Sequence, residues 1–220
     1  MFWGSKMLKN IIIIGAGGVG RETALIIEDI NNVNKEWNII GFVDDNDDIQ
    51  NTKIDDYHVI GKLDYILNYK KEVYVVCAIA NYNVKKSIVN KLKSNKNIKF
   101  ATLIHPSTIL NRTVEVGEGC IIYQNVIVTT NVTIGNHVIV SPKAGIGHDT
   151  VVKDYCNLLW NVNISGNVVL KEGVLVGSGA TVIQGLEIGE GATLGAGAVV
   201  IRDIPMNKVA VGNPTRLIAN

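Results

Sequence analysis

The sequence has little of what would direct it to a membrane, a nucleic acid or an export route. No apolar run in its 220 residues approaches the ~20 residues needed to cross a bilayer, and the start, MFWGSKMLKN, lacks the apolar core of a signal peptide. The 21 basic and 20 acidic side chains leave a net charge of +1, so no overall field attracts nucleic acid or an anionic membrane surface. We therefore expect a cytoplasmic protein without nucleic-acid partners or membrane insertion.

Cysteine is also scarce. Cys77, Cys120 and Cys156 are isolated, odd in number and without CxxC spacing. This pattern suits buried thiols in a reducing compartment better than disulfides or a zinc site. The chain instead has 47% hydrophobic residues, enough for a substantial core in one domain or two small ones.

The first hundred residues alternate strand-like and helix-like segments. The run IIIIG at 11–15 is short and apolar, and a segment with apolar residues at helical spacing follows it at 21–31. Residues 38–45 and 72–80 have the composition of buried strands, and residues 82–95 that of an amphipathic helix. This order predicts a small parallel, Rossmann-like α/β sheet.

A strict period of six begins at Ile104 and continues to Val200 without an insertion. The first position of every hexad is Leu, Ile or Val, and the fifth is small or aliphatic, so each repeat sends two side chains inward, as in a hexapeptide β-helix. The fourth position is mostly Gly, Asn or Asp, which best accept a left-handed backbone at a tight corner. We therefore predict an α/β domain at residues 1–102 and a β-helix domain at residues 103–220.

The hexads make the second domain similar to the left-handed β-helix acyltransferases. That resemblance implies three hexads, or eighteen residues, in each triangular coil, and a homotrimer. It does not by itself imply catalysis, because the fold also serves proteins that do not acetylate.

His148 interrupts the aliphatic pattern in the segment GIGHDTVV. One interpretation is a solvated surface side chain. Eighteen residues later the same hexad position is Gly166, and with strands stacked ~4.8 Å apart its backbone amide would lie close to the imidazole, where it can stabilise an oxyanion. Asp149 either orients the imidazole or serves only as a corner residue.

A metal site is the rival explanation for His148. The β-helix carbonic anhydrases hold zinc with three histidines, and the hexad region here has only His105 and His137 besides His148. Their spacings are not multiples of eighteen, so the three do not stack on one face. We expect no metal, and we expect His137 to be a structural corner residue.

The segment GAGGVG at 15–20 matches G-x-G-x-x-G between a strand and a helix, which is the context of a phosphate-binding turn. The usual ligand is a dinucleotide with an acidic residue on a ribose. Only about half of a full dinucleotide site fits before the hexads begin, so one mononucleotide fits better. A turn needed only for helix–strand packing is the alternative.

A closer resemblance covers essentially the whole chain. The order of a glycine-rich α/β domain, LIHPSTI at 103–109, hexads containing GHD and finally VGNPTRLI at 211–218 resembles a family of sugar acetyltransferases. That family includes sialic acid O-acetyltransferases and the N-acetyltransferases of nucleotide-linked amino sugars. The resemblance implies that His148 is the general base, that Asp149 supports it, and that the backbone amide at Gly166 holds the thioester carbonyl.

The resemblance also implies where both substrates bind. The α/β domain would hold a UDP-type nucleotide sugar. Lys85 lies near the position at which the family often has an arginine, and lysine can supply the positive charge but not the two parallel hydrogen bonds of a guanidinium. Acetyl-CoA, the co-substrate, would lie between β-helices of the trimer and run towards the C-terminal coils. Asn157 occupies the position at which several members carry a second histidine. The predicted substrate-binding residues are Gly15, Gly17, Gly20, Asp44, Asp45 and Lys85, and those for acetyl-CoA are Asn157, Gly166, Gly212, Asn213 and Pro214.

These observations predict an acetyl-CoA-dependent acetyltransferase that acts on the amino group of a nucleotide-linked 4-amino-4,6-dideoxysugar. Transfer would be direct, without an acyl-enzyme, because no cysteine is suitably placed as a nucleophile. Two alternatives stay open. One is O-acetylation of sialic acid or another sugar hydroxyl, and the other is a non-catalytic β-helix that binds a nucleotide sugar.

Overall fold

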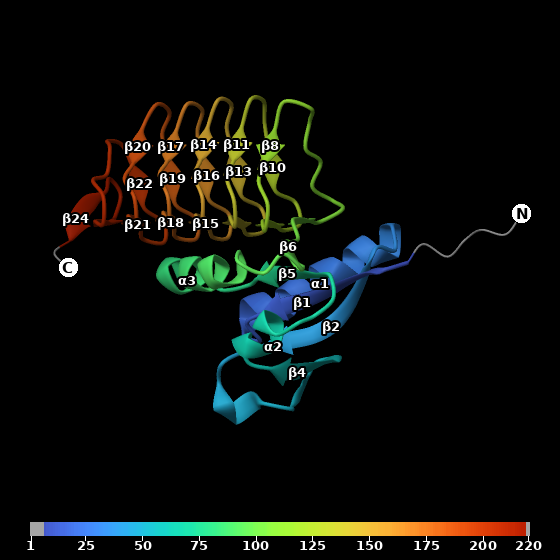
Figure 1. The fold of residues 1–220 in the computed structure, drawn as a ribbon. Helices are drawn as coiled ribbons and strands as arrows, with labels where there is room; N and C mark the ends of the chain where they lie inside the picture. Colours follow the sequence, from blue (N-terminus) through green and yellow to red (C-terminus); the bar gives the residue numbers. More distant parts are fainter. Residues whose placement is uncertain (1–6, 219–220) are drawn as a thin grey trace, which may run out of the picture.

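A computed structural model describes residues 7–218, which form two units packed side by side (Figure 1). The N-terminal unit is an α/β sheet, and the C-terminal unit is a stack of short parallel strands. This arrangement confirms the predicted fold class, a small Rossmann-like α/β domain followed by a parallel β-helix. Within the described residues, no helix combines the length and apolar character that a bilayer span requires.

The α/β unit is a six-stranded sheet in the order β3-β4-β2-β1-β5-β6, parallel except for the β3–β4 pair. Its strands are β1 (Lys9–Ile14), β2 (Trp37–Val43), β3 (Lys53–Ile54), β4 (Tyr57–Gly61), β5 (Val73–Cys77) and β6 (Ile98–Phe100). Its helices are α1 (Gly18–Val33), α2 (Leu63–Leu67) and α3 (Tyr82–Leu92), with a 3-10 turn, η1 (Asp47–Ile49). The isoleucines of β1 are buried on both faces, which explains the uninterrupted apolar run.

Several boundaries differ from the expectation, and three of these differences are at carboxyl ends of elements in the α/β unit. The strand expected at 38–45 ends at Val43, the one expected at 72–80 ends at Cys77, and the helix expected to reach residue 95 ends at Leu92. The residues beyond β2 and β5 belong instead to loops at the carboxyl ends of the strands. In an open α/β sheet that edge is where ligands bind.

The β-helix has three sheets, parallel except for the β23–β24 pair, and each is named here by its strand in the coil that contains His148. The β13 sheet has the order β10-β13-β16-β19-β22, the β14 sheet β20-β17-β14-β11-β8, and the β15 sheet β24-β23-β21-β18-β15-β12-β9-β7. The strands are β7 (Leu103–Ile104), β8 (Glu115–Val116), β9 (Ile121–Ile122), β10 (Ile127–Val128), β11 (Thr133–Ile134), β12 (Ile139–Val140), β13 (Gly145–Ile146), β14 (Val151–Val152), β15 (Asn157–Leu158), β16 (Asn163–Ile164), β17 (Val169–Leu170), β18 (Leu175–Val176), β19 (Thr181–Val182), β20 (Glu187–Ile188), β21 (Thr193–Leu194), β22 (Val199–Val200), β23 (Val209–Val211) and β24 (Arg216–Ile218).

The coil length is eighteen residues, as the pairing of Gly145 with Asn163 and of Asn163 with Thr181 shows. The corners have the left-handed backbone expected at the fourth hexad position, with φ +59° at Asp149. His137, Lys143 and Tyr155 adopt the same conformation although two of these residue types are unusual there. The His137 ring stacks on Tyr155 at 5.3 Å, so packing stabilises those corners.

The α/β unit covers the β15 sheet and its neighbouring corners. Ile121, Tyr123 and Ile139 of the β-helix share one buried cluster with Ile11 of β1 and Ile27 of α1. Figure 1 shows α1 and α3 below this sheet, whereas the turns that join the β13 and β14 sheets form the opposite, upper edge. The two units therefore leave the β13–β14 corner uncovered.

Candidate active site

His148 lies in the uncovered turn between β13 and β14. Its Nδ1 is 2.8 Å from the Asp149 carboxylate, and the side chains are 54% and 45% exposed. The hydrogen bond with His148 holds the pKa of Asp149 below its ordinary value. When Asp149 accepts the proton on Nδ1, Nε2 remains as the nitrogen that can take a proton from a substrate. The pair therefore has the orientation of a general base with its supporting carboxylate.

Asn131 extends this pair, and the sequence did not point to it. Its amide Nδ2 donates to the other carboxylate oxygen of Asp149 at 3.2 Å, and the Asp149 amide donates to the Thr130 carbonyl at 3.0 Å. Asn131 is the corner residue one coil before Asp149. The available signal was a polar side chain at the same hexad position eighteen residues earlier.

Gly166 lies directly against the imidazole. A Cβ built on Gly166 would be 2.5 Å from both Cε1 and Nε2 of His148, and one built on Gly147 would be 2.6 Å from the Gly166 nitrogen. Within residues 7–218 the Gly166 amide has no hydrogen-bond acceptor. Because Gly147 and Gly166 have no side chains, the imidazole of His148 lies beside the free N–H of Gly166. The structure thus brings His148, Asp149 and Gly166 together.

The glycine-rich turn forms a second site at the carboxyl edge of the α/β sheet. Gly15, Asp44 and Asp45 line a cavity of about 210 Å³. Its remaining wall is apolar and comes from Ile14, Val43, Leu63, Ile79, Val84 and Ile88. Gly17 is the N-cap of α1 without a side-chain cap, and the first turn has no acidic residue. The amide groups of that turn are therefore available to an anion.

Asp44, Asp45 and Gly20, the other predicted residues near this turn, also have structural roles. The Asp44 carboxylate accepts hydrogen bonds from the Ala16 and Asn46 amides, each at 2.9 Å. These bonds fix the loop after β2 to the glycine turn. Asp45 accepts the Leu63 amide at 2.9 Å. A Cβ on Gly20 would lie 1.9 Å from the Gly15 carbonyl oxygen, so Gly20 is required for packing of α1 on β1.

The structure places Lys85 and Asn157 in the interface between the two units. Both residues are completely buried there. Lys85 Nζ donates to the His137 carbonyl at 2.9 Å and to Asn157 Oδ1 at 3.0 Å. The reason is that α3 packs against the β15 sheet, so the side chain of Lys85 points into the interface.

The C-terminal residues Gly212, Asn213 and Pro214 are exposed between β23 and β24. A neighbouring cavity of about 490 Å³ is lined by residues that include Arg202 and Arg216, which the sequence analysis did not single out. Arg202 is at the hexad position of His148, three coils later. That spacing was the signal that could have identified it.

Two matches cover most of the chain, and one relative decides the family. Residues 10–92 match the model of the PglD N-terminal domain, and residues 167–202 match that of the bacterial transferase hexapeptide, six repeats. The chain is 30% identical to the putative acetyltransferase YJL218W of Saccharomyces cerevisiae, over 68% of this chain and 77% of that protein. The chain belongs to the hexapeptide-repeat acetyltransferases.

Two further proteins are similar to this acetyltransferase. It is 29% identical to a GDP-perosamine N-acetyltransferase of Escherichia coli O157:H7, over 79% of this chain and 78% of that protein. The crystal structure of PerB from Caulobacter crescentus in complex with CoA and GDP-perosamine matches with a TM-score of 0.84 and 26% identity, over 98% and 100% of the two chains. The resemblance and the acyltransferase class expected from the sequence are thereby confirmed.

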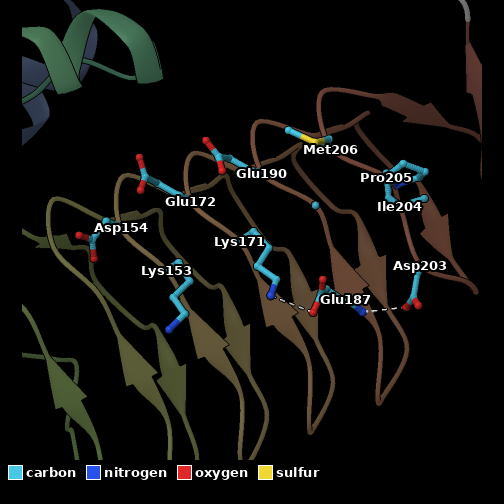
Figure 2. A pocket seen from close by; sticks show the side chains of 11 residues that line it. Lys153, Asp154, Lys171, Glu172, Glu187, Glu190, Asp203, Ile204, Pro205 and Met206 are labelled. Atoms are coloured by element: carbon cyan, nitrogen blue, oxygen red, sulfur yellow. Dashed lines mark hydrogen bonds and ion pairs between the residues drawn. The ribbon is translucent and has the colours of Figure 1, made fainter.

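Another cavity of this acetyltransferase, of about 1030 Å³, is lined by none of the predicted site residues (Figure 2). It follows the corner between the β14 and β15 sheets, and its charged residues are Lys153, Asp154, Lys171, Glu172, Glu187, Glu190 and Asp203. The acidic side chains are partly engaged, since Lys171 pairs with Glu187 at 3.0 Å and Glu172 accepts the Tyr82 hydroxyl at 2.7 Å. Residues 7–218 contain no cluster of His, Cys, Asp or Glu arranged to hold a metal ion.

Burial of Lys85 in this acetyltransferase predicts a pH dependence of stability. Burial lowers its pKa to about 8 from an ordinary 10.5. Between those values the unfolded chain binds more protons than the folded one, so the contribution of Lys85 to the free energy of unfolding rises with pH, by up to about 1.4 kcal/mol per pH unit. Lys85→Met removes that contribution. Denaturant unfolding from pH 8 to pH 10 should show the wild type gaining stability relative to the variant.

Lys91→Met is the control for this measurement because Lys91 is exposed on the same helix. Its difference from the wild type should not change with pH. The buried thiols Cys77, Cys120 and Cys156 are common to all three proteins. Because the charge of Lys85 lowers the pKa of each thiol, their titration cancels only in the comparison with Lys91→Met. A difference between wild type and Lys85→Met that is independent of pH would contradict the lowered pKa.

Proposed function

We propose that the chain transfers acetyl from acetyl-CoA to the amino group of a nucleotide-linked sugar. The observation that carries this proposal is the His148–Asp149 pair lying against the free amide of Gly166. A second site that suits a nucleotide diphosphate accompanies it, at the glycine turn. The names of the similar proteins point the same way, since one is a GDP-perosamine N-acetyltransferase and another was crystallised with CoA and GDP-perosamine.

The three residues have separate roles in this reaction. Nε2 of His148 accepts a proton from the amine as the amine nitrogen attacks the thioester carbon. Asp149 stabilises the imidazolium that results, and the Gly166 N–H donates to the developing oxyanion. When the intermediate collapses, the carbon–sulfur bond breaks and the imidazolium returns the proton to the departing thiolate. The amide product and free CoA thiol then balance the reaction.

Acetyl-CoA fits the corner that runs from His148 to the C-terminal coils. Arg202 is on that corner three coils beyond His148, roughly 14 Å at the usual strand spacing. Arg202 and Arg216 are exposed cations that suit the phosphates of the cofactor, close to Gly212, Asn213 and Pro214. The thioester would then reach Gly166 at the other end. Asn157, being buried, is not part of this cofactor site.

The position of the α/β unit supports a homotrimer with shared sites. The nucleotide cavity lies on the side of the β15 sheet, whereas His148 lies at the opposite corner. A sugar held in one chain therefore meets the His148 of another. The β13 sheet offers apolar outward side chains for such contacts, with Ile127 at 66% exposure. We place the reaction in the cytoplasm, which suits the three free thiols.

The nucleotide site is proposed at the turn of Gly15, Gly17 and Gly20. The uncapped amides at the start of α1 suit the diphosphate, and the apolar wall of the 210 Å³ cavity suits the base. Asp44 and Asp45 keep carboxylate oxygens near the cavity for the nucleoside end. Whether that base is uracil or guanine is left to the experiment.

Thiol release from acetyl-CoA tests the proposal. The acceptor panel contains UDP- and GDP-linked 4-amino-4,6-dideoxysugars, their 4-hydroxy counterparts and free sialic acid. We expect thiol release with an amino sugar and a mass gain of one acetyl group on its nitrogen. Release only with hydroxyl acceptors would replace N-acetylation by O-acetylation. No release and no binding of acetyl-CoA would favour a non-catalytic, nucleotide-sugar-binding β-helix.

A further inference from the structure

Lys85 is buried at a place where burial is costly. Among residues 7–218 it is the only lysine, arginine, aspartate or glutamate that is fully buried. Its ammonium has two acceptors, both on the β-helix, the His137 carbonyl at 2.9 Å and Asn157 Oδ1 at 3.0 Å. No carboxylate pairs with it in the described structure. Apolar side chains of similar volume often stabilise such positions at least as well.

Asn157 joins Lys85 to the loop that follows β5. Its Nδ2 donates to the Ala80 carbonyl at 2.9 Å, while its Oδ1 accepts from Lys85. Asn157 also donates to the Tyr155 carbonyl at 3.3 Å, which anchors the amide to its own coil. One buried side chain thus connects the β-helix to two points of the α/β unit, Ala80 and Lys85. We call the side chains of Lys85 and Asn157 together the Lys85–Asn157 bridge.

The two points are next to the nucleotide cavity. Ile79 precedes Ala80 and lines the cavity, and Val84 precedes Lys85 and lines it too. The N-cap Asn81 lies between them and accepts the Val84 amide at 3.1 Å. The segment from Ile79 to Lys85 is therefore one wall of the cavity, and its two fixed points, Ala80 and Lys85, both contact Asn157.

We propose that Lys85 and Asn157 are positioning residues that set this wall of the nucleotide site against the β-helix. The role rests on the proposed nucleotide-sugar substrate. It accounts for a buried ammonium that has no carboxylate partner among the described residues. It also assigns a positioning role to Asn157, for which the sequence suggested contact with acetyl-CoA.

The test separates positioning from stability with three variants. Lys85→Met/Asn157→Leu replaces the whole bridge by apolar side chains of similar volume, and Asn157→Asp keeps the acceptor for Lys85 but loses the donor to Ala80. Lys91→Met is the matched control on the exposed face of α3. Thermal unfolding, calorimetric binding of GDP and UDP without a second substrate, and KM for both substrates are measured on each.

We expect the double variant to unfold at or above the wild-type temperature and yet to bind the nucleoside diphosphate about tenfold more weakly. Its KM for the nucleotide sugar should rise in parallel, with KM for acetyl-CoA unchanged. Asn157→Asp should show the same selective loss, and Lys91→Met none. A folded double variant with wild-type nucleotide affinity would overturn the positioning role. A wild type that binds neither GDP nor UDP would instead overturn the nucleotide-sugar substrate, and the positioning role with it.

Discussion

Replacing His148 with Ala should lower turnover by at least ~10²-fold, because the variant loses the base that takes the proton from the attacking amine. The side chain is about half exposed, so the fold should not change. Thiol release at saturating concentrations of both substrates measures the effect. Sedimentation of wild type and variant should show the same species, which is three chains if the proposed trimer is correct.

His58→Ala is the control for this experiment. His58 is exposed on β4 of the α/β unit and lies outside both proposed sites. Its replacement should leave turnover within about twofold of the wild type. Near-normal turnover of His148→Ala would remove the general-base role, whatever the control does.

Replacing Gly166 with Ala should lower turnover by more than ~10-fold, with the coil intact. The added methyl would meet the imidazole of His148 at 2.5 Å, and a partly exposed side chain can rotate away at little cost to the fold. The backbone of Gly166 is not among those with positive φ, so alanine is compatible with it. The rotated imidazole would no longer face the thioester. Steady-state kinetics and thermal unfolding together measure the two effects.

A double variant isolates the cause of that loss. If Gly166→Ala acts only by displacing the imidazole, then adding it to His148→Ala should lower turnover no further. An additive loss would show that the alanine also disturbs the oxyanion site. Wild-type turnover of the single Gly166→Ala variant would contradict the close approach of the imidazole to this glycine.

The β-helix and the place of His148 could be read from the sequence. Hydrogen bonds between successive coils repeat every eighteen residues, so a period of six with glycine or asparagine at the corners is sufficient to assign the walls and the turns. The same periodicity placed Gly166 beside His148. Asn131 follows from the same rule, applied one coil in the other direction.

The ends of the strands in the α/β unit were less predictable. Asp44 and Asp45 follow an apolar strand and were taken into it, but their carboxylates accept backbone amides of neighbouring loops. Such contacts join residues 18 to 28 positions apart, and no local pattern encodes them. Their position at the carboxyl edge of the sheet is nevertheless what makes a nucleotide site there reasonable.

By itself, the sequence determined the two kinds of fold, because each has its own short periodicity. The coil of eighteen residues, and with it the pairing of His148 with Gly166, was implied by the resemblance to the β-helix acyltransferases, and the strand pairing confirms it. Only the tertiary structure decided where Lys85 and Asn157 lie. They are 72 residues apart in the sequence and form a hydrogen bond where α3 packs on the β15 sheet. It also decided that His148 and the nucleotide cavity lie on opposite sides of the β-helix. The orientation of one domain on the other depends on a whole interface of side chains, and no periodicity in the chain records it.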